Sequence, residues 1–187
     1  YLNEVIGASR SMGSLIDGLL ILSRSTQGEL RRDAIDLTAL ALSIRAELQR
    51  AEPQRRVDWE IQPHMVAHGD ARMIEATLRN LLANAWKYTE HVESAKIRFY
   101  SETTPPDTWF VVSDNGAGFD MTHADRLFKP FQRLHRQDEF PGIGIGLATV
   151  KRVISRHGGQ IKASAMPGRG ATFSFTLGSD NAQESTA

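Results

Sequence analysis

Apolar residues recur along this chain at two spacings, one typical of helices and the other of strands. Recurrence every three or four positions predicts helices over residues 1–25, 36–51, 71–88 and 147–157. Alternation of apolar and polar positions, bounded by turn-forming residues, predicts strands. The expected strands cover residues 57–61, 65–68, 96–100, 108–112, 160–165 and 172–177. Helices and strands in this order indicate an α+β domain with a helix in front of it.

The first 25 residues carry a heptad pattern in which Val5, Met12 and Leu19 occupy one core position. Further apolar residues widen this surface beyond a two-stranded seam, which favours a helical bundle. The alternative is a helix that folds against its own domain. The polar stretch 23–33 is expected to be a linker.

Composition excludes several classes of protein. Among 187 residues, 22 Lys and Arg balance 22 Asp and Glu, so no overall field favours nucleic acid or an anionic membrane surface. The absence of cysteine excludes disulfides and thiol catalysis. No apolar run approaches membrane-spanning length, and we expect neither nucleic-acid binding nor membrane contact. The length fits one domain with an appendage or two small domains. Because Tyr1 is not an initiator methionine, we expect the chain to lie inside a larger protein.

Candidate chemistry begins at the end of the strand expected over 108–112, where Asp114 is followed by a glycine-rich turn. A carboxylate at a strand end can accept a hydrogen bond from a ligand amino group, such as that of adenine. Gly116 and Gly118 let the backbone approach such a ligand without a Cβ clash. A plain turn is the alternative interpretation of this stretch.

The helix expected over 71–88 has a polar face as well as an apolar one. Asn80, Asn84 and Lys87 are spaced four and three residues apart, so they stack on the polar face. An asparagine carbonyl oxygen suits Mg²⁺, and a lysine one turn later supplies a point charge for phosphates. The alternative is a face that is simply solvated.

A second glycine loop, at Gly142, Gly144 and Gly146, precedes the helix expected over 147–157. Glycines that open a helix make an anion site, because free backbone N–H groups and the helix dipole face the ligand. The long polar stretch 122–141 lies just before this loop and is expected to be a functional or mobile lid. Its phenylalanines could pin that lid, or they could simply pack in the core.

In this order the segments resemble the catalytic, ATP-binding part of bacterial sensor histidine kinases, whose Bergerat fold is shared with gyrase, Hsp90 and MutL. The matching segments are the N box Asn80–Thr89, the first glycine box Asp114–Gly118, the F box Phe128–Phe131, the second glycine box Gly142–Leu147 and the last glycine box Gly168–Gly170. The run 131–140 looks most like kinases attached to PAS or phytochrome-type sensors. Residues 1–25 are similar to the second helix of the dimerisation and histidine phosphotransfer domain.

The resemblance implies a two-layer α/β sandwich over residues 31–178, with a mixed sheet covered by three helices. It implies a partial dimerisation domain and linker over 1–30 and a disordered tail over 179–187. ATP and Mg²⁺ are the implied cofactors. By matching position, Asp114 binds the adenine amino group and Asn84 holds Mg²⁺, with Asn80 nearby.

The other implied roles concern the phosphates. Asn80, Lys87 and Arg133 are the implied catalytic residues, and Arg133 stabilises charge on the transferring phosphoryl group. The remaining implied nucleotide-binding residues are Tyr88, Gly116, Gly118, Gly142, Gly144, Gly146 and Leu147.

The implied reaction is transfer of the γ-phosphate of ATP to a histidine outside this chain, for relay to an aspartate of a response regulator receiver domain. The implied partners are a second copy of the chain, bound through residues 1–25, the receiver domain and an upstream sensor domain. The implied location is the cytoplasm, and a membrane anchor further upstream stays compatible with it.

Two positions depart from the family pattern, because Ile143 replaces a usual threonine and Ala171 replaces a usual hydroxyl residue. They put fine nucleotide contacts in doubt. One alternative function is an ATP-hydrolysing conformational machine of the same fold. Asn80 argues against it, because the hydrolysing relatives carry a glutamate there. A second alternative is a non-catalytic dimerising module, against which Asn84, Asp114 and the intact glycine boxes argue.

Overall fold

The structure is a computed structural model, and it describes residues 30–132, 134, 140, 142 and 144–178. The helix expected over 1–25, the tail from residue 179 and Arg133 lie outside the described residues.

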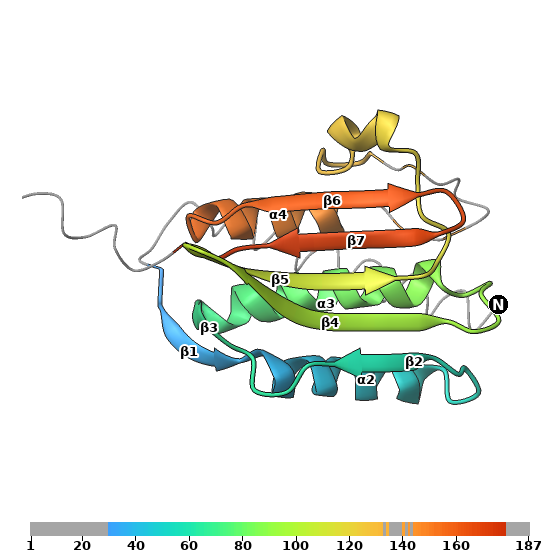
Figure 1. Ribbon diagram of the computed structural model, residues 1–187, viewed down its shortest axis with the longest axis horizontal. Helices are drawn as coiled ribbons and strands as arrows, with labels where there is room; N and C mark the ends of the chain where they lie inside the picture. The colour runs from blue at the N-terminus through green and yellow to red at the C-terminus, as the bar shows by residue number, and fades with distance from the viewer. Residues whose placement is uncertain (1–29, 133, 135–139, 141, 143, 179–187) are drawn as a thin grey trace, which may run out of the picture.

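A five-stranded mixed sheet forms one layer of the described part of the chain, in the order β2-β4-β5-β7-β6 (Figure 1). These strands are β2 Asp58–Ile61, β4 Lys96–Thr104, β5 Asp107–Asp114, β6 Ile161–Met166 and β7 Gly170–Phe175. Strand β2 runs parallel to β4, and the other neighbours in the sheet are antiparallel. The expected hairpins β4–β5 and β6–β7 are both present.

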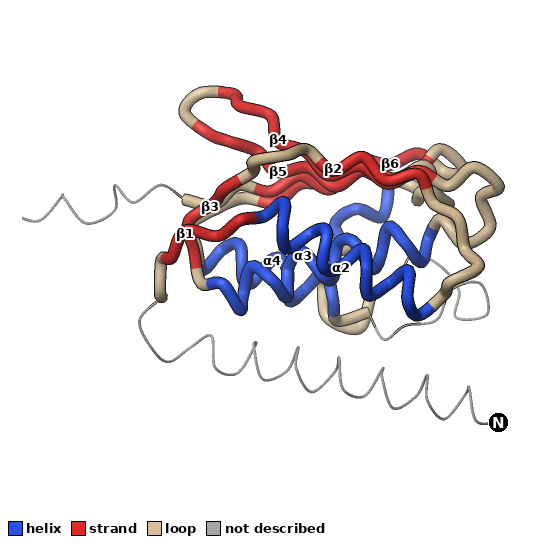
Figure 2. The backbone as a smooth tube through the Cα atoms, turned by 90° about the horizontal axis from the view of Figure 1, so that it is seen from below, coloured by secondary structure: helices blue, strands red, loops and turns tan. Residues whose placement is uncertain are grey.

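Three α-helices within the described residues form the second layer and cover one face of the sheet (Figure 2). They are α2 Leu37–Ala51, α3 Ala71–Tyr88 and α4 Gly146–Arg156. Helix α3 begins where the sequence predicts, because the Asp70 side chain accepts hydrogen bonds from the amides of Arg72 and Met73. The expected two-layer sandwich with a mixed sheet and three helices is confirmed.

The core lies between the helices and the sheet. The apolar face expected on α3 is buried there, and Ile74 and Leu78 are fully inaccessible to solvent. They pack with side chains of the sheet such as Phe99 and Val112. Burial of one such side chain contributes about 1.5–3 kcal/mol. Because the apolar face of α3 is buried, its polar face is the one available to a ligand.

Two elements differ from the sequence expectations. Strand β1, Asp33–Asp36, lies where the linker was expected to end, and it pairs antiparallel with β3, Val66–Gly69. A 3-10 helix η1, Met121–Arg126, occupies the start of the stretch expected to be a loop. No helix in the described part of the chain is both long enough and apolar enough to cross a membrane.

Candidate active site

Asp114 is the last residue of β5, as expected, and its carboxylate lies at the end of the sheet. Its Oδ1 accepts hydrogen bonds from the amides of Gly116, at 2.8 Å, and Ala171, at 3.3 Å. Its other oxygen accepts no hydrogen bond from the described residues. Burial raises the pKa of the Asp114 carboxyl to about 6, although the two amide hydrogen bonds oppose this rise. Asp114 therefore has one carboxylate oxygen available as an acceptor, at a position partly shielded from solvent.

The glycine turn after Asp114 packs against α3 and against the β6–β7 hairpin. A Cβ on Gly116 would lie 2.3 Å from the Tyr88 carbonyl oxygen, and one on Gly118 would lie 2.0 Å from the Met166 carbonyl oxygen. Gly118 also has a φ of 60°, which favours glycine. The Tyr88 carbonyl accepts a hydrogen bond of 2.9 Å from the amide of Ala117. This close approach joins the first glycine loop directly to the end of α3.

Asn80 and Asn84 lie on the polar face of α3, half-buried. The Asn80 side-chain amide donates to the Ala76 carbonyl at 2.8 Å. Its Oδ1 lies only 2.4 Å from where a Cβ on Gly146 would be. The start of α4 is thus packed directly on Asn80. The carboxamide of Asn84 makes no hydrogen bond to a described residue, so its oxygen is available to a ligand.

Lys87 and Tyr88 end α3 beside the second glycine loop. The Lys87 ammonium lies 4.3 Å from the centre of the Tyr88 ring. Its Nζ is 3.3 Å from where a Cβ on Gly142 would be. Phe140, which is buried, packs edge-on against Tyr88 with ring centres 5.0 Å apart. The structure therefore brings Lys87 to the loop that the sequence analysis expected to bind phosphate.

The second glycine loop leads into α4, which starts at Gly146 without a side-chain cap at its N-terminus. The first amides of such a helix can bind an anion. Gly144 has a φ of 80°, and its carbonyl accepts a hydrogen bond of 2.9 Å from the amide of Phe131. Leu147 packs against the hydrophobic core.

The two phenylalanines of the F box differ in their surroundings. The sequence left open whether these phenylalanines pin a lid or pack in the core. Phe128 packs against the core, whereas Phe131 is 66% exposed. Arg133 lies outside the described residues, as do most residues between it and Gly142.

Metal binding at this site would depend on amide oxygens. Among the described residues, no group of three His, Asp or Glu side chains is arranged to hold a metal ion. Asn80 and Asn84 carry neutral side-chain oxygens, a kind of ligand that suits Mg²⁺ when the ion shares the phosphates of a nucleotide.

Two contacts of the site were not anticipated from the sequence. The Ala171 amide donates to Asp114, although the side chain at this position has no polar group. Asn115 holds the first glycine loop to the start of β4, since it accepts from the Lys96 amide at 2.7 Å and donates to the Ser94 carbonyl at 2.9 Å. The Asp-Asn-Gly turn signal could have suggested the second contact, whereas a backbone amide leaves no signal in the sequence.

A comparison with known families identifies the chain. Residues 69–181 match the model of the histidine kinase-, DNA gyrase B- and HSP90-like ATPases. The chain belongs to this ATPase family. The match includes α3, both glycine loops and Asp114, so the family's shared region and the site described above coincide.

Similar curated proteins extend the comparison beyond the ATPase domain. The chain is 32% identical over 167 residues to the phytochrome-like protein Cph1 of Synechocystis sp. The aligned region covers 89% of the chain and 22% of that protein. It is 33% identical over 175 residues to the adaptive-response sensory kinase SasA of Thermosynechococcus vestitus. This alignment covers 90% of the chain and 46% of that protein. The chain thus spans less than half the length of either relative.

Solved structures share the fold. The histidine kinase AdeS of Acinetobacter baumannii superposes with a TM-score of 0.72 at 24% identity, over 96% of this chain and 82% of that one. This likeness shows the fold. The family match and the similar sensor kinases confirm the expected resemblance to the ATP-binding region of sensor histidine kinases.

Proposed function

We propose that this domain binds ATP with Mg²⁺ and transfers the γ-phosphate to a histidine outside the chain, for relay to a response regulator aspartate. The observation that carries the proposal is the meeting of both glycine loops with one helix. Tyr88 of α3 contacts the first loop through Gly116 and Ala117, and Asn80 contacts the start of α4 at Gly146. A nucleotide between these loops would have its base near Asp114 and its phosphates near the start of α4.

The residue roles follow from this arrangement. The free oxygen of Asp114 accepts the hydrogen bond of the adenine amino group, and Gly116 and Gly118 allow close approach of the base. Gly142, Gly144, Gly146 and Leu147 shape the phosphate side, where the amides of α4 and the ammonium of Lys87 offset negative charge. Tyr88 borders the same side.

Mg²⁺ fits the amide oxygens of Asn84 and, next to it, Asn80, and it supplies charge neutralisation between the phosphates. Arg133 would add positive charge at the transferring group. An amide at Asn80 cannot deprotonate a water molecule, whereas a glutamate can. This favours transfer to a side chain over hydrolysis, so the ATP-hydrolysing machine stays the second candidate and a steady-state ATPase assay distinguishes the two.

The proposed partners follow from similarity to sensor kinases. They are a second copy of the chain bound through residues 1–25, a response regulator receiver domain, and an upstream sensor domain of PAS or phytochrome type. A cytoplasmic location fits a protein that uses ATP.

Calorimetric titration with ATP tests the nucleotide site. We expect Asp114→Asn to weaken ATP binding about ten- to a hundredfold, because a hydrogen bond to a charged acceptor contributes about 1.5–3 kcal/mol. Asp107→Asn, at the exposed start of β5, is the matched control and should bind ATP as the wild type does. An Asp114→Asn variant with wild-type affinity would refute the assigned adenine site.

The metal site has its own test. We expect Asn84→Ala to remove most of the gain in ATP affinity that Mg²⁺ gives the wild type, while changing the free energy of unfolding little. Equal affinity of the wild type with Mg²⁺ and with EDTA would refute the metal site.

A further inference from the structure

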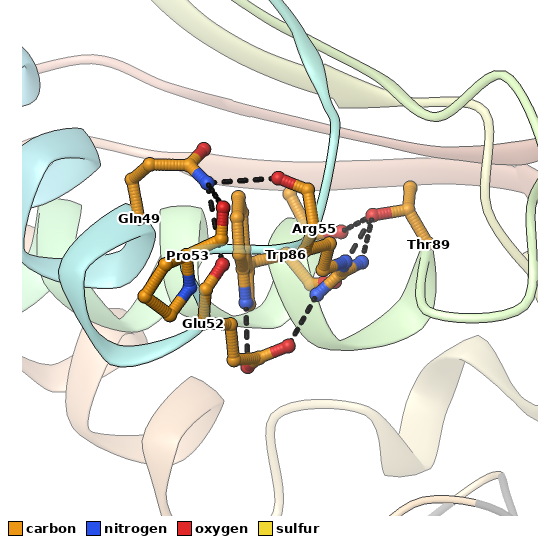
Figure 3. Close-up of polar contacts among 7 residues, drawn as sticks. Gln49, Glu52, Pro53, Arg55, Trp86 and Thr89 are labelled. Atoms are coloured by element: carbon orange, nitrogen blue, oxygen red, sulfur yellow. Dashed lines mark hydrogen bonds and ion pairs between the residues drawn. The ribbon is translucent and has the colours of Figure 1, made fainter.

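Arg55 lies in the segment between α2 and β2, none of whose residues is assigned to the nucleotide, yet it contacts the end of α3. Its guanidinium donates hydrogen bonds to the Trp86 carbonyl and, at 2.9 Å, to the Thr89 hydroxyl (Figure 3). The same group lies 4.2 Å from the centre of the Trp86 ring. The Arg55 side chain is only 13% exposed. The long, positively charged side chain of Arg55 is therefore largely buried against the last turn of α3.

These contacts complete the C-terminus of α3. The last carbonyls of a helix lack partners within the helix, and a cation there also interacts favourably with the helix dipole. The Thr89 hydroxyl donates toward the Ala85 carbonyl at 2.8 Å, and Arg55 supplies donors to Trp86 and to Thr89 itself. Removal of the guanidinium would leave the Trp86 carbonyl without this partner.

The neighbours of Arg55 hold it in place. Glu52 accepts a hydrogen bond of 2.9 Å from the Trp86 indole and lies 3.8 Å from the guanidinium. The Gln49 side chain donates to the Arg55 carbonyl at 2.8 Å (Figure 3). Burial lowers the pKa of Arg55, and the nearby carboxylates of Glu52 and Glu90 oppose that change, so the group stays charged. The α2–β2 segment thus presents a fixed donor group to the end of α3.

Tyr88, the last residue of α3, lies between the two residues that Arg55 contacts and forms the wall of the first glycine loop. The Tyr88 carbonyl accepts the Ala117 amide at 2.9 Å, and Gly116 has no room for a Cβ against that same carbonyl. A small displacement of the last turn of α3 would therefore displace the turn that follows Asp114.

We propose that Arg55 is a positioning residue for the nucleotide pocket, which acts by fixing the last turn of α3 against the first glycine loop. This inference rests on the proposed ATP site. The α2–β2 segment would then influence nucleotide affinity although none of its residues contacts the nucleotide.

The test compares Arg55→Met, Arg55→Lys and the wild type. Methionine keeps an unbranched stem over Trp86 and removes the donors, and lysine restores a charged donor near the helix end. The matched control is Arg79→Met on α3, since the Arg79 side chain is 42% exposed and pairs with Glu47 and Glu75 instead of the end of the helix. Each variant is titrated with ATP and unfolded with urea, and amide hydrogen exchange is followed at Ala117 and, as an internal reference in β5, at Val112.

We expect Arg55→Met to weaken ATP binding about 3- to 30-fold at a temperature where the variant is fully folded. Arg55→Lys should recover part of the affinity, and Arg79→Met should match the wild type. Without ATP, exchange at Ala117 should accelerate in Arg55→Met more than exchange at Val112. A purely structural role would lower the free energy of unfolding and accelerate both amides alike, with no change in affinity.

Two results would overturn the inference. One is wild-type ATP affinity in folded Arg55→Met, and the other is unchanged relative exchange at Ala117. If Arg55→Met does not fold, Arg55→Lys decides by the same two measurements. It should bind ATP more weakly than the wild type, and its Ala117 amide should exchange faster relative to Val112. A wild-type chain that binds no ATP would instead refute the proposed function, and the exchange comparison would still decide whether Arg55 holds the loop.

Discussion

Asp114 is subject to opposing effects on its charge. Burial favours the neutral acid, and the amides of Gly116 and Ala171 favour the carboxylate. The raised pKa, about 6, brings the titration of this group close to physiological pH. ATP binding requires the carboxylate as an acceptor, so proton uptake by Asp114 and ATP binding should compete.

We therefore expect ATP affinity to depend on pH through Asp114. Above about pH 7 the carboxylate is ionised and this contribution to affinity is constant. As the pH falls through 6, protonation weakens binding, with a limiting slope of about tenfold per pH unit. Calorimetric titrations from pH 8 to pH 5 measure the effect, with Asp114→Asn as reference because both proteins share the titration of the ATP phosphates. Parallel profiles for the two proteins would contradict the prediction.

Gly116 offers a second test at the scale of one residue. A Cβ at this position would lie 2.3 Å from a backbone oxygen that cannot turn away. We expect Gly116→Ala to weaken ATP binding about ten- to a hundredfold, because overpacking of this kind costs about 1–3 kcal/mol and separates the loop from α3. Calorimetry on the folded variant measures it.

Gly158, just after α4, is the matched control for that substitution. The nearest described atom to a Cβ placed there is 3.9 Å away, an ordinary contact, although its φ of 72° disfavours alanine. Gly158→Ala should lose about 1–2 kcal/mol of stability and keep its ATP affinity. Equal affinity losses in both variants would show that backbone strain, not the contact with Tyr88, matters at Gly116.

At the scale of elements, His157 joins the two helices that carry the site. It lies at the end of α4, fully buried, and its Nε2 accepts a hydrogen bond of 3.0 Å from the Asp70 amide at the start of α3. The Nδ1 nitrogen therefore carries the proton and donates to the Val153 carbonyl at 2.8 Å. A second proton on the ring would place a donor against the Asp70 amide, so the neutral form is required.

This arrangement predicts that the contribution of His157 to stability is lost in acid. Burial lowers the pKa of His157 from 6.5, and nearby Arg32 and Arg156 act in the same direction, whereas the Val153 carbonyl and Asp70 oppose them. Above pH 6.5 both folded and unfolded chains hold a neutral ring, so the full contribution is present. Below pH 6.5 the unfolded chain binds the proton first, and stability falls until the folded-state pKa is reached, with a limiting slope of about 1.4 kcal/mol per pH unit.

Urea unfolding between pH 8 and pH 5 measures this dependence. The difference in the free energy of unfolding between the wild type and His157→Gln isolates the histidine, because both proteins share the opposite contribution of Asp114, whose raised pKa favours the folded state as the pH falls. His157→Gln should be less stable at pH 8, and this difference should shrink as the pH falls below 6.5. His68→Gln, at an exposed position of β3, should keep the wild-type slope. A wild-type slope that survives in His157→Gln would refute the assignment.

Periodicity predicted the large elements because burial on one face dictates it. The apolar face of α3 and the alternation in β5 leave clear patterns, and both elements appear where the sequence places them. Strand β1 has only Ile35 buried and is held by pairing with residues thirty or more positions away. Helix η1 buries none of its residues. Neither element could leave a pattern in the sequence.

The site was predictable to the same extent. Motif order and spacing indicated Asn80, Asn84, Lys87 and Asp114, and the structure brings Asn80 and Lys87 to the second glycine loop. Arg55 was not predictable, because its partners lie 31 and 34 residues further along the chain. Such a contact depends on how α2 and α3 pack, which local sequence does not encode.

At the scale of the whole molecule, the proposed binding residues and the proposed acceptor belong to different chain segments. None of the six histidines is followed by Asp or Glu, and residues 1–25 contain no histidine. We expect the 187-residue chain to bind ATP and to form no phosphohistidine. A longer chain that also carries a phosphotransfer helix with a histidine should be labelled.

Radiolabelled ATP tests both proteins, with acid treatment to separate labile phosphohistidine from stable phosphoserine. Acid-labile label on the 187-residue chain alone would show that the acceptor has been assigned to the wrong segment.

The parallel pairing of β2 with β4 has a consequence for the order of folding. The hairpins β4–β5 and β6–β7 join neighbouring segments, so each can form early from local contacts. Strand β2 is an edge strand of four residues, and it can pair only after the long crossover through α3 is in place. The β2 edge should therefore be the last part of the sheet to form and the first to open. Since the segment that carries Arg55 leads into β2, a bound nucleotide should slow that opening and protect an edge of the sheet that it does not touch.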